Sequence, residues 1–448
     1  MTSLHADTVL LPTGWHEGVR IEMDGGRIAA VHAGQEPARD DERHAVIVPG
    51  VGNLHSHAFQ HAMAGLTERR GREGDNFWTW RELMYRFALA MTPDDVEAVA
   101  AMLYARMLEA GFTRVGEFHY LHHDRGGNHY ADIGEMAGRI AAASAATGIG
   151  LTLLPVFYAH SDFGGAPPNP QQRRFISSLE SFGRLHERSA GIVSGLEGGV
   201  VGLAPHSLRA ATTEEIGQLL ALSPDGPVHI HVAEQVAEVE ACRARHGVGP
   251  VRLLLDNAPV DDRWCLVHAT HMTADEIADM AARGAVAGLC PITEANLGDG
   301  IFAGTEFRHA GGAFGVGSDS NVSISLPGEL RQYEYSQRLR LRIRNAIADA
   351  GGSTGRILFE GALAGGSQAL GVPQGIARGN WADMVSLDRS GAPCLSNDDL
   401  LDKWIFGDGI DVDSVWARGR RQVRGGRHVH RDALASAFNG AMERLTAG

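Results

Sequence analysis

Three His-x-His motifs stand out among the 22 histidines of the chain, and two of them lie where a metal ion could bind. His55-Ser56-His57 and His229-Ile230-His231 each end a short apolar stretch, whereas His428-Val429-His430 lies beside arginines and is expected at the solvated surface. Side chains two residues apart on a strand point to the same face. His55 and His57 can therefore present two imidazole nitrogens to one ion.

Further candidate ligands follow two other apolar stretches. His231 ends the stretch Val228–Val232, and Asp319 follows Ala313–Gly317. At this histidine density about one His-x-His motif arises by chance. The prediction therefore depends on candidate ligands occurring at the ends of several different strands. Three imidazoles and one carboxylate suit Zn²⁺ or a similar divalent ion with an open position for water. The predicted metal ligands are therefore His55, His57, His231 and Asp319, and such an ion can lower the pKa of a bound water to about 7.

Two residues could carry protons beside this ion. Glu234 follows His231 by three residues and could donate to a leaving nitrogen, although an acidic first turn of the next helix explains it equally well. His268 ends its own apolar stretch and could orient or deprotonate the water. His271 competes weakly for that role, and we prefer the strand-terminal His268.

Several other catalytic signatures are absent or misplaced in the sequence. It contains no H-x-E with a following P-C-x-x-C, no G-x-x-x-x-G-K-S/T and no H-E-x-x-H. One G-x-S-x-G occurs at residues 351–355, but it follows a helical pattern, whereas a nucleophile elbow follows a strand. We therefore expect a loop there.

Repeated βα units would position the candidate residues. From about residue 49 to 325, short apolar stretches alternate with helical patterns of ten or more residues. Capping residues followed by acids mark helix starts at Thr92 and Thr273. Eight strands in about 270 residues predict an α/β fold of the (β/α)8, or TIM barrel, type. The expected strand ends lie near His55, His119, Tyr158, His206, His231, His268, Pro291 and Asp319.

The two ends of the chain show strand-like stretches and turns instead of repeated βα units. Val19–Met23 and Arg27–His32 flank the turn Asp24-Gly25-Gly26, and strand character returns at Ala382–Leu387 and Ser414–Val423 before Gly425-Gly426. We expect residues 1–48 and 375–430 to form one small β-sandwich-like domain, residues 49–374 to form the barrel, and residues 431–448 to form a helical tail.

Composition limits the partners. The 448 residues carry a formal net charge of −14, which disfavours nucleic acid and anionic membranes. No apolar run reaches the roughly 18 residues of a membrane helix, no signal-like segment opens the chain, and the four cysteines are widely spaced. We therefore expect a soluble cytoplasmic protein, and an anionic substrate would need a local cluster of arginines.

The assembled residues resemble the amidohydrolase superfamily. The resemblance covers nearly the whole chain and rests on Pro49-Gly50, Asn53–His57, His231 with Glu234, His268 and Gly317–Ser320, with a return to the β-domain at Gly379–Asp388. No lysine that could be carboxylated to bridge two ions follows the fourth strand, where the sequence reads Gly202-Leu203-Ala204-Pro205-His206. The resemblance therefore favours the one-metal, deaminase-like branch.

Within that branch, three stretches resemble the N-formimino-L-glutamate deiminases: Asn53–Gln60 with Ala62–Gly65, Phe77–Arg81 and Gly116–His123. His61 departs from the pattern, where Arg is expected. The resemblance implies a homodimeric hydrolase of C–N bonds in histidine degradation, which converts N-formimino-L-glutamate to N-formyl-L-glutamate and ammonia with catalytic residues Glu234, His268 and Asp319. It also implies substrate contacts at Gln60, Arg81, Tyr120, His206 and Arg209.

Arginine forks bind carboxylates bidentately, which suits a dicarboxylate substrate. Arg69 and Arg70 are expected at a loop surface, and Trp78 and Trp80 are expected in core or lid packing. Two alternatives stay open: another one-metal aminohydrolase acting on a purine, pterin or triazine ring, and a catalytically silent barrel that binds a dicarboxylate. The helical segment 329–348 is a possible dimer face, although ordinary packing explains it as well.

Overall fold

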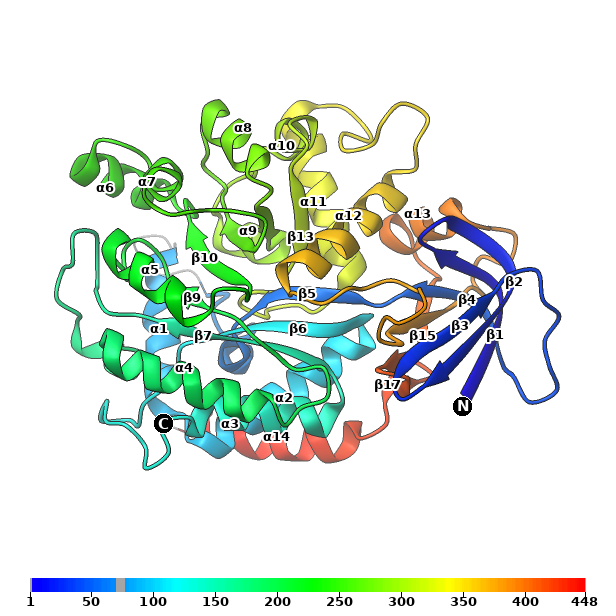
Figure 1. Cartoon of the computed structure of the whole chain (residues 1–448), viewed down its shortest axis with the longest axis horizontal. Helices are drawn as coiled ribbons and strands as arrows, with labels where there is room; N and C mark the ends of the chain where they lie inside the picture. The colour runs from blue at the N-terminus through cyan, green and yellow to red at the C-terminus, as the bar shows by residue number, and fades with distance from the viewer. Residues whose placement is uncertain (1, 70–76, 448) are drawn as a thin grey trace.

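The computed structural model describes residues 2–69 and 77–447, and a closed parallel barrel forms its centre (Figure 1). The barrel strands are β5 (Val51–Ser56), β6 (Phe112–His119), β7 (Gly150–Phe157), β8 (Val200–Val201) with β9 (Ala204–Pro205), β10 (Val228–Val232), β11 (Trp264–His268), β12 (Val286–Leu289) and β13 (Ala313–Val316). Parallel pairing links β5 to β8 and β10 to β13. The predicted strand ends differ from the observed ones by at most three residues, and the (β/α)8 prediction is confirmed.

Single bridges close the barrel at its two seams. Leu203 pairs with Val228 and Ser207 with His231 between the fourth and fifth strands, and Ser56 pairs with Asp319 between the first and last strands. The last bridge brings the segment around His57 directly beside Asp319, since the His57 N–H donates to the Asp319 carbonyl and the Asp319 N–H donates to the His55 carbonyl, each at 3.0 Å. Residues about 260 positions apart in the chain are thus held at one barrel edge.

Helices surround the barrel (Figure 1). They are η1 (Ala58–Met63), α1 (Phe77–Ala90), α2 (Pro93–Glu109), α3 (Glu135–Thr147), η2 (Pro170–Gln172), α4 (Leu179–Val193), α5 (Thr213–Leu219), η3 (Leu220–Leu222), α6 (Val236–His246), α7 (Pro250–Asn257), α8 (Ala274–Ala282), α9 (Pro291–Leu297), α10 (Gly304–His309), α11 (Leu326–Leu341), α12 (Thr354–Ala369), α13 (Asp398–Phe406) and α14 (Arg431–Thr446). In the described residues, no helix is both long enough and apolar enough to cross a bilayer.

The predicted helix starts form as expected. Thr92 accepts a hydrogen bond from the Asp95 N–H and Asp95 reaches back to the Thr92 backbone, a reciprocal capping box at the start of α2. Thr273 and Glu276 do the same at α8. Ser353 of the G-x-S-x-G segment accepts from the Arg356 N–H and caps α12, so this segment is a loop leading into a helix.

Both chain ends build one eight-stranded sheet beside the barrel (Figure 1). Its order is β17-β16-β15-β14-β4-β1-β2-β3, with β1 (Thr2–Leu11), β2 (Gly14–Asp24), β3 (Arg27–His32), β4 (Glu42–Pro49), β14 (Met384–Asp388), β15 (Asp411–Ala417), β16 (Arg420–Arg424) and β17 (Arg427–His428). The predicted stretch Ser414–Val423 is two strands, because Arg418 and Gly419 turn the chain with φ of 49° and 69°. A separate apolar core, which includes Val9, Ile21 and Trp416, underlies this sheet.

The third His-x-His motif is solvated only in part, because Val429 and His430 are exposed but His428 is not. His428 ends the last hairpin and is buried, with its Nε2 2.9 Å from the Thr147 carbonyl and its backbone N–H donating to Glu109. The hairpin packs against the end of α2, which explains the burial. His430 lies at the surface, as expected.

Candidate metal-dependent active site

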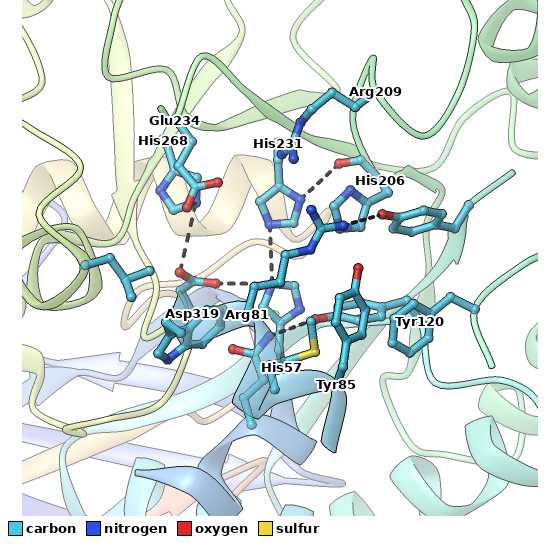
Figure 2. Close-up of a pocket in the computed structure, with 16 residues that line it drawn as sticks. His57, Arg81, Tyr85, Tyr120, His206, Arg209, His231, Glu234, His268 and Asp319 are labelled. Carbon is cyan, nitrogen blue, oxygen red and sulfur yellow. Dashed lines mark hydrogen bonds and ion pairs between the residues drawn. The ribbon is translucent and has the colours of Figure 1, made fainter. Parts of the chain in front are cut away.

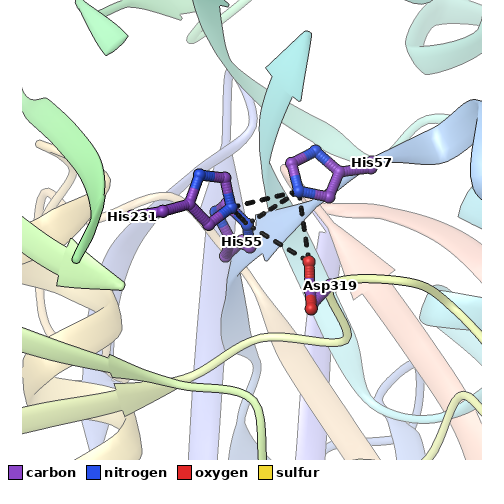
Figure 3. Close-up of side chains that lie close together, drawn as sticks. All are labelled: His55, His57, His231 and Asp319. Carbon is purple, nitrogen blue, oxygen red and sulfur yellow. Dashed lines mark hydrogen bonds and ion pairs between the residues drawn. The ribbon is translucent and has the colours of Figure 1, made fainter. Parts of the chain in front are cut away.

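Four side chains from three strand ends converge at the carboxyl edge of the barrel (Figure 3). The Nε2 atoms of His55, His57 and His231 lie 3.0–3.3 Å from one another. Asp319 Oδ1 lies 3.4 Å from His55 Nε2 and 3.1 Å from His57 Nε2. Ligands bound tetrahedrally at 2.0–2.1 Å from a zinc ion lie about 3.3 Å apart. The four predicted ligands therefore fit one small divalent ion.

Hydrogen bonds fix the ring orientation of two of these histidines. His57 Nδ1 lies 3.0 Å from the Phe118 carbonyl, and His231 Nδ1 lies 3.0 Å from the His206 carbonyl. A carbonyl only accepts, so each Nδ1 carries the proton and each Nε2 keeps its lone pair for the ion. His55 Nδ1 has no hydrogen-bond partner, so no carbonyl fixes the tautomer of this ring.

The ionisation of these groups also suits a cation. Burial lowers the pKa of His55 to about 3 and that of His231 well below its ordinary value, so both imidazoles are neutral. Burial alone would raise the pKa of Asp319, but its contacts with His55 and His57 outweigh burial and hold it well below its usual range. Neutral imidazoles and an ionised carboxylate are the forms that bind a metal.

The backbone is strained where these side chains are placed. Ala233, His268 and Asp319 adopt left-handed conformations with φ of 53°, 66° and 44°, which residues other than glycine seldom occupy. Such strain concentrates at functional sites, where the surrounding structure imposes it. Here it turns the chain sharply as strands β10, β11 and β13 end, so that polar side chains reach over the barrel mouth.

A cavity opens beside the four-ligand cluster, and His57, His231 and Asp319 form part of its wall (Figure 2). It is lined by His57, Gln60, Trp80, Arg81, Met84, Tyr85, Tyr120, Tyr158, Phe175, His206, Arg209, His231, Glu234, His268, Leu297 and Asp319. All five predicted substrate-contact residues are in this lining, and both candidate proton carriers are there as well. The structure thus places the predicted substrate contacts and proton carriers in one cavity.

Two guanidinium groups face this cavity (Figure 2). Arg209 is buried, its Nε has no hydrogen-bond partner, and the nearest carboxylate is Glu238 Oε1 at 3.9 Å. Burial lowers the pKa of Arg209, but the charges of Glu238 and Glu234 outweigh this and raise it, so the group stays charged. Arg81 donates from Nη2 to the Tyr158 hydroxyl at 3.0 Å. A buried guanidinium with an unused donor fits a carboxylate ligand.

The amide of Gln60 is held at the cavity wall. Its Nε2 donates to the Tyr120 hydroxyl at 2.7 Å, while its buried Oε1 has no partner. The neighbouring His61, which departs from the family pattern, lies outside the cavity lining and bonds to the Asn321 carbonyl at 2.8 Å and to Arg106 at 3.0 Å. It ties η1 to the segment that carries Asp319.

Carboxylates surround His268 on both ring nitrogens. Its Nδ1 lies 3.3 Å from Glu294 Oε1, and its Nε2 lies 3.7 Å from Glu234 Oε1 and 3.9 Å from Asp319 Oδ2. Burial opposes the charged form, but these carboxylates outweigh it and raise the pKa of His268. Burial raises the pKa of Glu234. A proton is therefore available between Glu234 and His268.

Other sequence expectations have mixed outcomes. His271 is absent from the cavity lining and contacts the Asp299 carbonyl at 2.8 Å, which supports the preference for His268. Arg69 is exposed, as expected, and Trp80 lines the cavity. Arg70 and the side chain of Trp78 lie outside what the structure describes.

Sequence reasoning missed the aromatic wall and the acids behind His268. Tyr85, Tyr158 and Phe175 line the cavity, and Glu294 contacts His268 from α9. The short Phe77–Arg81 resemblance ended four residues before Tyr85, so continuing it along the helix by one turn would have found that residue. No signal in the sequence marks Glu294, because this residue lies inside helix α9 and not at the end of a barrel strand.

Comparisons with known proteins agree with this geometry. Residues 46–421 match the model of the amidohydrolase family, and residues 1–45 match the model described as the N-terminal domain of formimidoylglutamate deiminase HutF. The chain is 49% identical over 446 residues to the formimidoylglutamate deiminase of Pseudomonas aeruginosa, covering 98% of each protein. It is 29% identical over 341 residues to the 8-oxoguanine deaminase of the same organism, covering 72% of each.

Solved structures show the same architecture. A crystal structure described as an amidohydrolase from Brucella melitensis superposes with a TM-score of 0.98 at 58% identity, covering 99% of this chain and 100% of that one. Atrazine chlorohydrolase TrzN from Arthrobacter aurescens TC1, solved in complex with zinc, shares the fold at 19% identity with a TM-score of 0.79, covering 99% and 100% of the two chains.

Proposed function

Because the chain belongs to the amidohydrolase family, and within it to the formimidoylglutamate deiminases, we propose that it hydrolyses N-formimino-L-glutamate to N-formyl-L-glutamate and ammonia. One observation supports this most directly. A buried, charged and incompletely bonded Arg209 faces the same cavity as the four-ligand cluster. On a protein of net charge −14, this places a local positive charge where a dicarboxylate can bind beside a metal.

Side chains of the cavity wall bind the carboxylates of the substrate. Arg209 and Arg81 approach the cavity from different segments, so they can hold two separate carboxylates of an extended substrate. Gln60 offers its unused Oε1 as an acceptor, with its orientation fixed by Tyr120. His206 completes the polar wall between Tyr120 and Arg209. These residues position the formimino group over the cluster of His55, His57, His231 and Asp319.

A divalent ion held by these four ligands would polarise the amidine and make a water molecule nucleophilic near neutral pH. Glu234 stands at the cavity edge, where burial raises its pKa, and donates a proton to the departing nitrogen. His268, held through Nδ1 by Glu294, orients the attacking water. Asp319 accepts a proton from that water through Oδ2, the oxygen nearer to His268.

The metal, the compartment, the oligomeric state and the domain division belong to the same proposal. We infer that the ion is Zn²⁺, because three imidazoles and one carboxylate in a tetrahedron suit it, and that the enzyme works as a cytoplasmic homodimer. Tyr335 and Leu339 of α11 and Ile343 just after it are exposed and offer an apolar contact face, although Tyr333 of the same helix is buried. The units 1–48 with 375–430, 49–374 and 431–448 remain our proposed division of the chain.

A direct assay tests the function. Purified protein loaded with one equivalent of Zn²⁺ should release ammonia from N-formimino-L-glutamate and none from guanine in the same coupled assay. The aromatic wall of Tyr85, Tyr158 and Phe175 suits a ring substrate too, so the competing aminohydrolase predicts the reverse result. Metal binding with no ammonia from either compound would instead indicate a silent binding protein.

Replacing Arg209 should separate binding from chemistry. Arg209→Met removes a charge-assisted hydrogen bond worth about 1.5–3 kcal/mol, so KM should rise by roughly 10- to 100-fold. Arg209→Lys keeps the charge but loses the fork and should recover part of the loss. Steady-state kinetics measures both parameters. A fall in kcat with unchanged KM in both variants would exclude carboxylate binding by Arg209.

A further inference from the structure

Three buried side chains form a second cluster beside the four-ligand site. Glu234 follows β10, His268 ends β11, and Asp299 lies in the loop after α9. One ligand atom from each lies within 4.8 Å of the other two. Each side chain is at least nine-tenths buried. An imidazole and two carboxylates from three separate segments thus point toward one small volume.

Asp299 is the member that the proposed chemistry does not use. It is 4% exposed, Gln235 Nε2 donates to its Oδ1, and its buried Oδ2 has no hydrogen-bond partner. A buried carboxylate oxygen without a partner costs free energy unless a proton or a cation compensates it. In the absence of a cation, the pKa of Asp299 is raised to about 9, first by burial and then by the charge of Glu234.

The surroundings are strongly acidic. Glu294 and Asp319 also lie within 4 Å of His268, so four carboxylates share one imidazole. An ion at the four-ligand site would neutralise Asp319 and leave the other three. Arg209 attracts Glu234 but faces the substrate cavity. The unpartnered Asp299 Oδ2, together with Glu234 and the His268 imidazole, therefore offers donor atoms for a cation on the Asp299 side of His268.

We propose that Glu234, His268 and Asp299 form a second, weaker divalent-cation site, distinct from the four-ligand site, and that its occupation inhibits the enzyme. One imidazole nitrogen and two carboxylate oxygens with an open position are a donor set that Zn²⁺ accepts. A cation bound there coordinates one carboxylate oxygen of Glu234, one of Asp299 and the Nε2 of His268. It occupies the side-chain oxygen from which Glu234 would donate, so turnover should fall as the second equivalent of metal binds.

An alternative cluster offers a matched control. His268, Cys290 and Asp319 also have ligand atoms within 4.8 Å of one another. The Cys290 Sγ is buried 3.9 Å from the Gly288 carbonyl, and burial raises the pKa of this thiol well above its usual value. A protonated thiol is a poor ligand, and Asp319 already serves the first ion. We therefore place the second cation with Asp299.

Zinc stoichiometry tests the proposal without relying on turnover. Protein holding one equivalent of Zn²⁺ is dialysed against rising Zn²⁺, and bound metal is measured by elemental analysis alongside any residual activity. Wild-type protein should take up a second, weaker equivalent. Asp299→Asn should weaken binding of that second equivalent by about 100-fold or more, because losing a residue that only supports a ligand already costs about 10- to 100-fold. Cys290→Ser should keep it.

Further measurements keep the result unambiguous. If Asp299→Asn keeps the first equivalent of Zn²⁺ and its circular-dichroism spectrum is unchanged, the variant is folded. Glu234→Gln should also lose the second equivalent of Zn²⁺. With Co²⁺ in place of Zn²⁺, no thiolate-to-metal charge-transfer band is expected. A single equivalent in wild-type protein at all concentrations, or a second equivalent lost in Cys290→Ser but kept in Asp299→Asn, overturns the proposal. Failure of the deiminase assay leaves this stoichiometry unaffected.

Discussion

Replacing Glu234 with glutamine should lower kcat by about 10²- to 10⁴-fold, the usual contribution of a positioned general acid. Glutamine keeps the size and one acceptor of the side chain but has no acidic proton for the leaving nitrogen. Because Glu234 lies outside the four-ligand cluster, the first equivalent of metal should remain bound. Single-turnover kinetics and elemental analysis on the same preparation measure both quantities.

A substrate analogue with a different leaving group tests the role of Glu234 more directly. A substrate analogue with a better leaving group than ammonia needs less protonation, so it should lose less rate in Glu234→Gln than the natural substrate does. Near-normal turnover of N-formimino-L-glutamate by the variant would remove Glu234 from the role of proton donor. Loss of the first metal equivalent would show instead that Glu234 supports the ion.

Replacing His231 with alanine should abolish tight metal binding and activity together. The variant leaves two imidazoles and one carboxylate for the ion, and the polarising effect of a metal is worth several kcal/mol of transition-state stabilisation. We expect kcat/KM to fall by at least about 10³-fold. Bound zinc per chain and kcat/KM, measured before and after addition of a chelator, check the prediction.

The same motif supplies the control for this experiment. His229 lies two residues before His231 on β10, and its Nε2 contacts the Ala369 carbonyl at 2.7 Å. His229→Gln preserves a donor for that carbonyl and removes the imidazole. This variant should keep its metal and its activity, whereas a loss equal to that of His231→Ala would place His229 in the site.

His229 and His231 also show how far the sequence predicts the site. Alternation along a strand puts both side chains on one face, and only the position of His231 at the carboxyl end of the strand favours it as a ligand. The same rule found His55, His268 and Asp319. Strand ends and spacing therefore predicted the barrel and the four-ligand cluster at its carboxyl edge, because parallel strands end there side by side.

The rest of the site depends on loops and helices that strand periodicity does not describe. Glu294 reaches His268 from α9, and Asp299 reaches Glu234 only because the loop after α9 folds back over the barrel. Likewise, His428 seemed a surface residue by composition, but the final hairpin packs on α2 and buries it. These contacts are set by tertiary packing between segments far apart in the chain.

The seam between β5 and β13 has a consequence for how the protein is made. His55 and His57 are synthesised early and Asp319 more than 260 residues later, and the bridge between Ser56 and Asp319 joins them. The complete coordination sphere therefore exists only after the ribosome has passed the last barrel strand. A ligand that binds only the finished form stabilises it by mass action. Metal binding thus stabilises the completed barrel, and a truncated chain that lacks Asp319 does not gain the same stabilisation.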